Sequence, residues 1–289
     1  MLGLLVLAIA PAVFILWYVY RKDYYEPEPL RLVIQVFLLG GLSVIPAAVI
    51  EYPFPSGIIT SSVVAPFVEE IIKFCVVFFF VYRLPEFDEP VDGMMYAAAA
   101  GLGFAAVENV FYVLEGGIAV GVLRAIASVP GHMIFSCIWG YALGTAKFRP
   151  GSAWRPIVIT GLAGSIVLHG IFNFSLEVYE VAGLVFILFF LIPLGLWYTR
   201  KNISKAHADP ASAFSLLQRS SVNGTGILPW NSGSGTDSYP SGPQSASPST
   251  ASSNTGRDQD GTRTVHYCTS CGTRVIDEER FCRNCGKEL

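Results

Sequence analysis

The residues best suited to chemistry lie inside an apolar run of the chain, where charged side chains are costly. Residues 58–82 are mostly apolar, yet they contain Glu69, Glu70 and Lys73 within five positions. A charged side chain at mid-membrane costs about 2.5–3.5 kcal/mol on insertion scales. Because Lys73 is four residues from Glu69 and three from Glu70, it can pair with either one on a helix. The group is therefore either an ion pair that holds helices together or part of a reactive site.

Later apolar runs carry further polar side chains at helical spacing: Glu108 with Asn109, then Arg124, Ser128 and His132, then His169 with Asn173. Residues four apart project from one face of a helix. Counting about 1.5 Å per residue from the outer ends of the runs places Glu69, Glu108 and His169 about 9–17 Å deep, and His132 about 20 Å deep. We therefore expect one cavity in the outer half of the membrane. Arg124 either binds a substrate carboxyl group there or pairs with a glutamate.

Such a cavity suits hydrolysis of an amide bond. A carboxylate sheltered from bulk water can act as a general base on a captive water molecule. Histidine and asparagine donors on a neighbouring helix can stabilise the oxyanion that forms when this water attacks. The chain contains no G-x-S-x-G motif, no H-E-x-x-H motif and no paired membrane aspartates, so serine, zincin-type and aspartyl mechanisms have no support.

The composition predicts an all-α polytopic membrane protein. Of its 289 residues 52% are hydrophobic and only 14% are charged, and the mean hydropathy is +0.50. Apolar runs predict about seven transmembrane helices near residues 2–20, 30–50, 58–82, 93–114, 119–146, 156–176 and 178–199. Asp92, at the start of the fourth, either caps that helix or takes part in function. Cys75 and Cys137 stand alone in apolar runs and are interpreted as packing residues. The partners expected are the lipid bilayer and a membrane-protein substrate, and no nucleic acid.

Basic residues set the expected orientation in the cell membrane. Lysine and arginine occur on alternate connections, namely at Arg21, Lys22, Arg31, Arg83, Lys147, Arg149, Arg155, Arg200, Lys201 and Lys205. The charged residues of the remaining connections are all acidic: Glu51, Glu115, Glu177 and Glu180. By the positive-inside rule the N-terminus lies outside and the C-terminus in the cytoplasm.

The chain divides into a membrane domain over 1–205, a disordered linker over 206–264 and a small zinc ribbon over 265–289. The linker is rich in serine, glycine and proline. The ribbon is predicted from Cys268, Cys271, Cys282 and Cys285, two C-x-x-C pairs that together suit one tetrahedral zinc ion. Disulfides and a bound iron are the alternatives. Four protein ligands leave no open position on the zinc ion, so its role is structural. A cytoplasmic protein is the partner expected for the ribbon.

Several short motifs together resemble the PrsW family of membrane-embedded proteases, which is related to CAAX prenyl endopeptidases and bacteriocin-processing enzymes. They are Tyr25-Glu26-Pro27-Glu28-Pro29, Glu69-Glu70-x-x-Lys73, Asp92-Gly93, Phe104-x-x-x-Glu108-Asn109, Pro130-Gly131-His132 and His169-x-x-x-Asn173. The resemblance covers nearly all of residues 20–175. It implies a helical protease that cuts membrane proteins such as anti-sigma factors near the extracytoplasmic boundary.

The resemblance also implies roles for individual residues. Glu69 would be the principal base and Glu70 an assistant, with Glu108 in the second-motif position. His169 and Asn173 would form the oxyanion site, and His132 would belong to the same constellation. Relatives commonly have aspartate where this chain has Asn173, and an amide is a poor metal ligand. Whether catalysis uses zinc or only glutamate-activated water stays open at this point.

Two other functions fit parts of the same pattern. A non-catalytic scaffold or sensor would bind transmembrane partners in the cavity and signal through the zinc ribbon. A proton-coupled transporter would use the buried acids as a relay, although the chain lacks the internal repeat that many transporters have.

Overall fold

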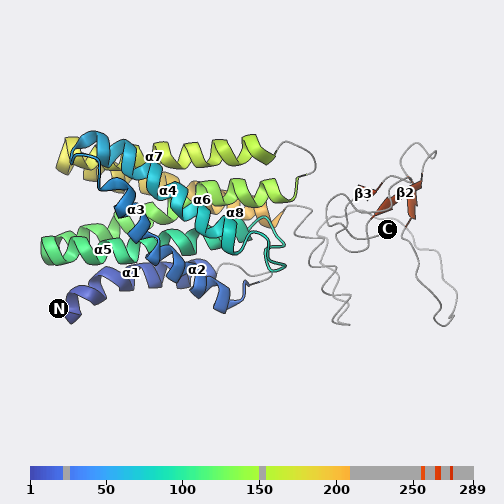
Figure 1. Cartoon of the computed structure of the whole chain (residues 1–289), viewed down its shortest axis with the longest axis horizontal. Helices are drawn as coiled ribbons and strands as arrows, with labels where there is room; N and C mark the ends of the chain where they lie inside the picture. Colours follow the sequence, from blue (N-terminus) through green and yellow to red (C-terminus); the bar gives the residue numbers. More distant parts are fainter. Residues whose placement is uncertain (22–26, 150–153, 209–254, 258–263, 268–273, 276–289) are drawn as a thin grey trace, which may run out of the picture. The chain divides into compact units, whose positions relative to one another are not determined.

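The chain folds into two units, residues 1–229 and residues 230–289. The computed structural model describes residues 1–21, 27–149, 154–208, 255–257, 264–267 and 274–275. In the first unit every regular element that is described is a helix (Figure 1). The elements are α1 (Leu2–Tyr20), α2 (Leu30–Leu42), α3 (Val44–Glu51), the π-helical turn η1 (Thr60–Val64), α4 (Ala65–Phe80), α5 (Asp92–Ile126), α6 (Ser128–Lys147), α7 (Trp154–Phe186), the π-helical turn η2 (Ile187–Leu191) and α8 (Ile192–His207).

Four helical stretches of the described residues are long and apolar enough to cross a membrane: Leu2–Tyr20, Leu30–Glu51, Asp92–Lys147 and Trp154–His207. The last two contain 56 and 54 residues, and each has a break in its helical backbone. The break in α5 is at Gly117, with φ of 70°, and the break in α7 is at Glu180, with φ of 42°. The all-helical membrane unit expected from the sequence is confirmed, and the number of seven crossings stays a prediction.

The first half of α5 is the central helix of the bundle. Every residue from Asp92 to Ala106 is buried, and α5 packs against α1, α2 and α6. A helix that is buried on all sides needs neighbours on all sides, so small residues are useful along it. Ala97–Ala100 and Gly101 supply them. This packing fixes the position of Glu108, two residues beyond the buried stretch.

Two glycines of α5 mark close contacts with neighbouring helices. A side chain at Gly103 would overlap the backbone carbonyl of Phe37 in α2, and one at Gly93 would overlap the carbonyl of Gly140 in α6. Neither position has room for a methyl group. The backbones of α2 and α6 can therefore approach α5 this closely only because α5 has no side chain at these two positions.

A second polar group lies at the end of the bundle where α5 begins. The Tyr96 hydroxyl donates to the Glu28 carboxylate, and Lys147 donates to the carbonyl oxygens of Tyr82 and Phe87 at 2.5 and 2.7 Å. Asp92 Oδ2 accepts the backbone N–H of Glu89 at 2.6 Å, which fixes the turn before α5. The N-cap residue is Val91, and no described side chain caps the N-terminus of this helix.

The second unit contains a three-stranded antiparallel sheet in the order β1 (Thr255–Arg257), β2 (Thr264–Tyr267), β3 (Arg274–Val275). Thr255 pairs with His266, and His266 pairs with Val275. Strand β1 falls within the segment for which the sequence predicts disorder, and it pairs with β2, the next strand along the chain. Thr255–Arg257 contains no apolar side chain that would have indicated a strand. Residues 206–208 of that segment end helix α8 or directly follow it, and Thr264 begins β2. The rest of the segment and the four predicted zinc ligands lie outside the described residues.

The close approach of α2 and α5 leads to a first prediction. Replacing Gly103 by alanine should lower the free energy of unfolding by about 1–3 kcal/mol, because the added methyl group overlaps the Phe37 carbonyl. Gly164→Ala is the matched control, since its nearest neighbouring atom would be Ile138 Cγ2 at 3.9 Å. That change should be neutral or stabilising by up to about 1 kcal/mol. Thermal unfolding in detergent micelles measures both, and equal shifts would contradict the packing argument.

Candidate active site

Three side chains meet at the ammonium group of Lys73. Its Nζ lies 3.1 Å from Glu69 Oε2, 2.9 Å from Glu70 Oε1 and 2.9 Å from His132 Nδ1. The Lys73 side chain is completely buried, and the ring of Phe104 lies with its centre 4.2 Å from Nζ. The sequence leaves open which glutamate the lysine pairs with; in the structure it contacts both at once.

Glu70 is surrounded by donors. Its Oε1 contacts Lys73 and also His169 Nδ1 at 3.1 Å. Its Oε2 accepts a hydrogen bond from Trp139 Nε1 at 3.0 Å. Ser165 Oγ lies 3.2 Å from the same oxygen and 2.7 Å from the Phe135 carbonyl oxygen, and its single hydrogen can serve only one of them at a time. Three full donors and this hydroxyl thus surround a side chain with no exposed surface. This carboxylate is fixed in position and orientation.

Trp139 and Ser165 belong to the site, and the sequence prediction missed both. Their spacing from the predicted histidines could have indicated them. Ser165 is four residues before His169 in α7, and Trp139 is seven residues after His132 in α6, so each shares a helical face with a predicted histidine. A tryptophan in an apolar run is usually a packing residue, which is why this one did not stand out.

Glu69 is held by fewer groups than Glu70. Its Oε2 contacts Lys73, and His132 Nδ1 lies 3.9 Å away. Its side chain keeps 8% of its surface exposed, whereas that of Glu70 is fully buried. Of the two carboxylates at the lysine, only Glu69 keeps any exposed surface.

Glu108 and Arg124 form the second half of the site, on either side of the break at Gly117. Glu108 Oε2 lies 2.7 Å from an Arg124 guanidinium nitrogen and 2.9 Å from His132 Nε2. Arg124 Nε also donates to Asn109 Oδ1 at 2.6 Å. Of the two roles considered for Arg124, pairing with a glutamate is the one that the structure contains.

The contacts assign the protons on both histidines. An ammonium group can only donate, so His132 Nδ1 accepts from Lys73, and the His132 Nε2 atom lies 2.9 Å from Glu108 Oε2. His132 therefore has its proton on Nε2. A carboxylate can only accept, so His169 donates its Nδ1–H to Glu70. His132 thereby connects the Lys73 group to Glu108.

Asn173 makes its hydrogen bond away from this network. Its Nδ2 donates to the backbone carbonyl of Ser61 at 2.8 Å, in the π-helical turn η1. The Ser61 hydroxyl in turn donates to the Glu177 carboxylate. These contacts hold α7 against the turn that precedes α4. Asn173 lies one helical turn beyond His169, at the edge of the site rather than against Glu69 or Glu70.

The donor types at the centre suit a transition metal. Ligand atoms of Glu69, Glu70, His132 and His169 all lie within 4.8 Å of one another, and carboxylate with imidazole is a common zinc set. However, Lys73 Nζ already lies 2.9–3.1 Å from atoms of the first three. A metal ion at these ligands would have to displace the ammonium group, so the set does not fit a metal while Lys73 stays in place.

Buried carboxylates and imidazoles that converge from α4, α5, α6 and α7 of a membrane bundle are typical of a membrane-embedded hydrolase. Residues 28–198, over half of the chain, match the model of the family described as PrsW family intramembrane metalloprotease. The chain belongs to the PrsW family of intramembrane proteases, which confirms the resemblance seen in its motifs. Residues 267–289 match the model of a zinc-ribbon domain.

Curated relatives agree with this assignment. The chain is 38% identical over 223 residues to Protease PrsW of Geobacillus kaustophilus (strain HTA426), covering 73% of this chain and 96% of that protein. It is 38% identical over 183 residues to Protease PrsW of Oceanobacillus iheyensis, covering 61% and 84%. It is 32% identical over 182 residues to Protease PrsW of Bacillus subtilis (strain 168), covering 61% and 84%. No solved structure matches the chain.

The position of Lys73 leads to a prediction about metal content. We expect the purified full chain to carry about one zinc ion, held by the ribbon cysteines. Lys73→Met should raise this to about two, because removing the ammonium leaves the carboxylates and imidazoles to a divalent cation. Elemental analysis of zinc per chain measures both proteins. If Lys73→Met folds only when zinc is added, that result supports the same conclusion.

The control is the double variant Lys73→Met with His169→Ala, which should return to about one zinc ion because a ligand has been removed. The prediction would be contradicted by a wild-type chain that carries two zinc ions and by loss of one of them in the single variant His169→Ala.

Proposed function

We propose that this protein is an intramembrane endopeptidase that cuts membrane-protein substrates, such as anti-sigma factors, near the extracytoplasmic boundary of the cell membrane, using water activated by Glu69. One observation carries the proposal: of the two glutamates at Lys73, Glu70 is fully bonded and buried, whereas Glu69 keeps an exposed surface. A base must be able to meet the proton that it removes.

In the proposed reaction Glu69 takes a proton from a water molecule as the water oxygen attacks the substrate carbonyl carbon. The same proton then passes from Glu69 to the nitrogen of the leaving amine as the peptide bond breaks. Lys73, bonded to both glutamates, keeps Glu69 in place throughout. Glu70 does not exchange protons and serves as a fixed negative charge that orients Lys73 and His169.

The oxyanion requires donors on the opposite side of the carbonyl group. His169 commits its Nδ1–H to Glu70, so it can donate to the oxyanion from Nε2 only as an imidazolium. Asn173 commits one of its two amide hydrogens to Ser61, and we assign the second to the oxyanion.

The membrane arrangement that goes with this function has seven crossings, with the N-terminus outside and the C-terminus in the cytoplasm. The breaks at Gly117 and Glu180 support it, because Gly117 lies between two of the apolar runs and Glu180 lies three residues after the gap between the last two. Cys268, Cys271, Cys282 and Cys285 of the zinc-ribbon domain hold a structural zinc ion in this proposal, and the ribbon binds a cytoplasmic partner.

The role of Glu69 can be tested in cells. Membrane-protein N-termini are compared between cells that express the wild type, Glu69→Gln, or Glu115→Gln at equal abundance. Glu115 is exposed and outside the site, so Glu115→Gln is the matched control. We expect new termini near outer membrane boundaries with the wild type and the control. With Glu69→Gln they should fall about 10²-fold or more, because a general base contributes about 10²–10⁴-fold to the rate. Undiminished cleavage by a folded Glu69→Gln protein would contradict the mechanism.

Asn173 gives a second test. Asn173→Ala should lower kcat about 10²-fold, the usual effect of removing one oxyanion donor. It should also lower the unfolding temperature slightly, because the bond to Ser61 is lost. Ser175→Ala is the control: its hydroxyl donates only within α7, to the carbonyl of Ile171 at 2.7 Å. A kcat for Asn173→Ala equal to that of the control would leave Asn173 with a purely structural role.

A further inference from the structure

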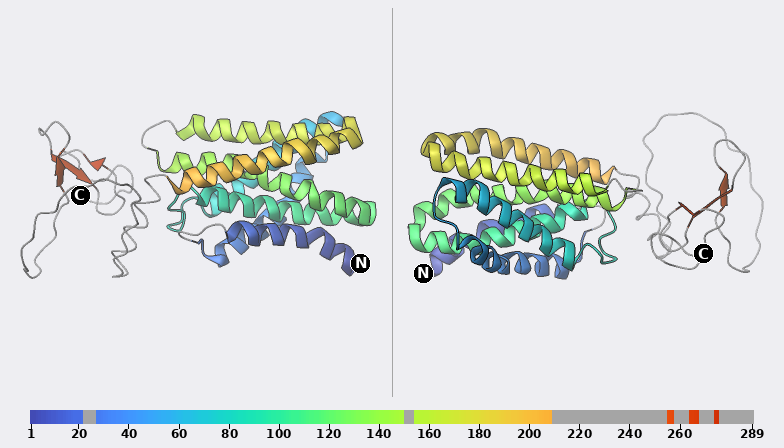
Figure 2. Two further views of the ribbon diagram at one scale, coloured as in Figure 1. Left: turned by 180° about the vertical axis from the view of Figure 1, so that it is seen from behind. Right: turned by 45° about the horizontal axis from the view of Figure 1, so that its top comes forward.

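A cavity separate from the active site lies between α1, α6 and α8. Its volume is about 880 Å³. Both α1 and α8 pack on α6, and the cavity occupies the space between them. Helix α8, orange in Figure 2, lies on the outside of the bundle. The cavity is therefore a slot along the membrane-facing side of the unit.

Most of the slot is apolar. Helix α8 contributes Ile192, Leu196 and Ile203, which share a helical face, and Ile15 of α1 and Met133 of α6 form the facing walls. All of these lie inside stretches long and apolar enough to cross a membrane. An extended hydrocarbon chain fits such a surface, because its burial there removes no hydrogen-bonding group from water.

One turn of α8 makes part of the slot polar. Thr199, Arg200 and Ser204 border the cavity together. The Thr199 side chain is 4% exposed, and its hydroxyl has no hydrogen-bond partner among the described residues. A buried hydroxyl without a partner costs about 1–3 kcal/mol, and a hydrogen-bond acceptor brought by a ligand would remove that cost. The neighbouring guanidinium favours an anion as that acceptor.

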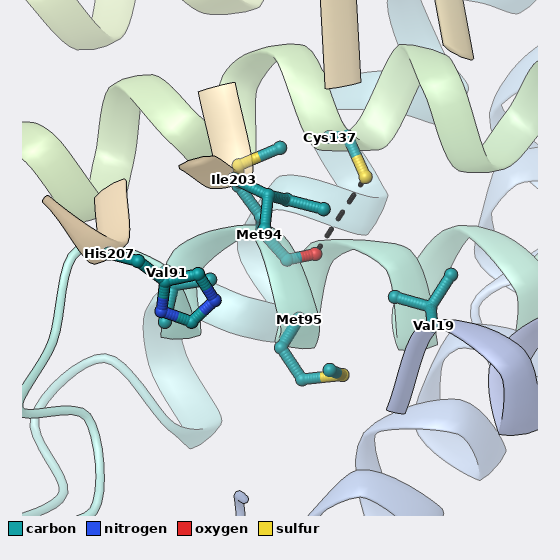
Figure 3. Close-up of a pocket in the computed structure, with 7 residues that line it drawn as sticks. All are labelled: Val19, Val91, Met94, Met95, Cys137, Ile203 and His207. Carbon is teal, nitrogen blue, oxygen red and sulfur yellow. Dashed lines mark hydrogen bonds between the residues drawn. The ribbon is translucent and has the colours of Figure 1, made fainter. Parts of the chain in front are cut away.

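The slot does not continue into the bundle. Beside its inner wall is a cavity of only about 10 Å³, bordered by Val19, Ile203 and His207 together with Met94 and Met95 (Figure 3). That space is about the size of one water molecule. A ligand of the slot therefore lies lengthwise along α8, with its polar end at Arg200.

We propose that this slot binds one anionic phospholipid. An acyl chain lies between α1 and α8, and the phosphate accepts hydrogen bonds from Arg200 and from the hydroxyls of Thr199 and Ser204. A guanidinium group binds phosphate through two parallel hydrogen bonds. Lys201 and Lys205 follow in the same helix, and clustered basic residues beside a membrane span attract anionic headgroups.

A protein helix suits the slot less well than a lipid. A helix with its side chains is about 10–12 Å across, and the apolar face that it would bring leaves the Thr199 hydroxyl and Arg200 without an acceptor. A phosphate satisfies both groups and leaves the apolar walls to the acyl chain.

The test uses the purified full chain in detergent, titrated with phosphatidylglycerol or with phosphatidylcholine of the same acyl chains, and native mass spectrometry counts the lipids bound. The variant is Thr199→Val with Arg200→Gln. The matched control is Lys201→Gln, which removes the same charge from the adjacent position. Lys201 lies over the Trp197 ring, 4.6 Å from its centre, and does not border the cavity.

We expect one phosphatidylglycerol bound to the wild type at least tenfold more tightly than phosphatidylcholine. The double variant should lose that preference, and Lys201→Gln should keep it. Phosphatidylglycerol should also raise the unfolding temperature of the wild type and of Lys201→Gln, but not that of the double variant. Equal losses in the variant and the control would mean attraction to general positive charge and would overturn the proposal. Equal affinity for the two lipids, or inorganic phosphate binding that depends on Arg200 as strongly, would overturn it too.

Discussion

The buried ammonium group of Lys73 is the interaction on which the membrane unit depends. Without it, Glu69 and Glu70 would be two negative charges on adjacent residues inside an apolar bundle, and removing one partner of a buried pair costs about 3–5 kcal/mol. With it, both carboxylates and His132 are held within 3.1 Å of one atom. The ammonium is both the counter-ion of the site and the point from which its geometry is set. The same position explains why a metal ion and Lys73 compete for one set of oxygens.

Adjacent glutamates acquire different properties because a helix turns by about 100° per residue. Glu70 points between α6 and α7, where Trp139, Ser165 and His169 supply donors. Glu69 points towards the side where Glu108 and Arg124 lie and receives fewer contacts. Two identical side chains thus become a fixed charge and an accessible one without any difference in their own chemistry.

Much of this arrangement could be predicted from the sequence, and the limits of the prediction have physical causes. Helical spacing places Lys73 within reach of both glutamates, and the helical membrane unit follows from long apolar runs. Trp139 and Ser165 were not predicted as site residues, because tryptophan and serine are common in packed helices. The direction of Asn173 depends on the π-helical turn η1, where the Ser61 carbonyl is available, and Thr60–Val64 contains no residue that signals such a turn. The partners of these three side chains are decided by tertiary contacts, which the local sequence pattern does not contain.

The break at Gly117 also bears on how the protein is made. Glu108 and Arg124 are only sixteen residues apart, on either side of that break, and they pair with each other. Glu69, Glu70 and Lys73 likewise pair within a single helix. Arg124 can therefore neutralise Glu108, and Lys73 one of its two glutamates, as each segment leaves the ribosome and before the other helices of the site have been synthesised. The second carboxylate of the Glu69–Glu70 pair has no counter-charge at that stage, and Glu70 gains its bonds from Trp139 and His169 only when α6 and α7 are in place.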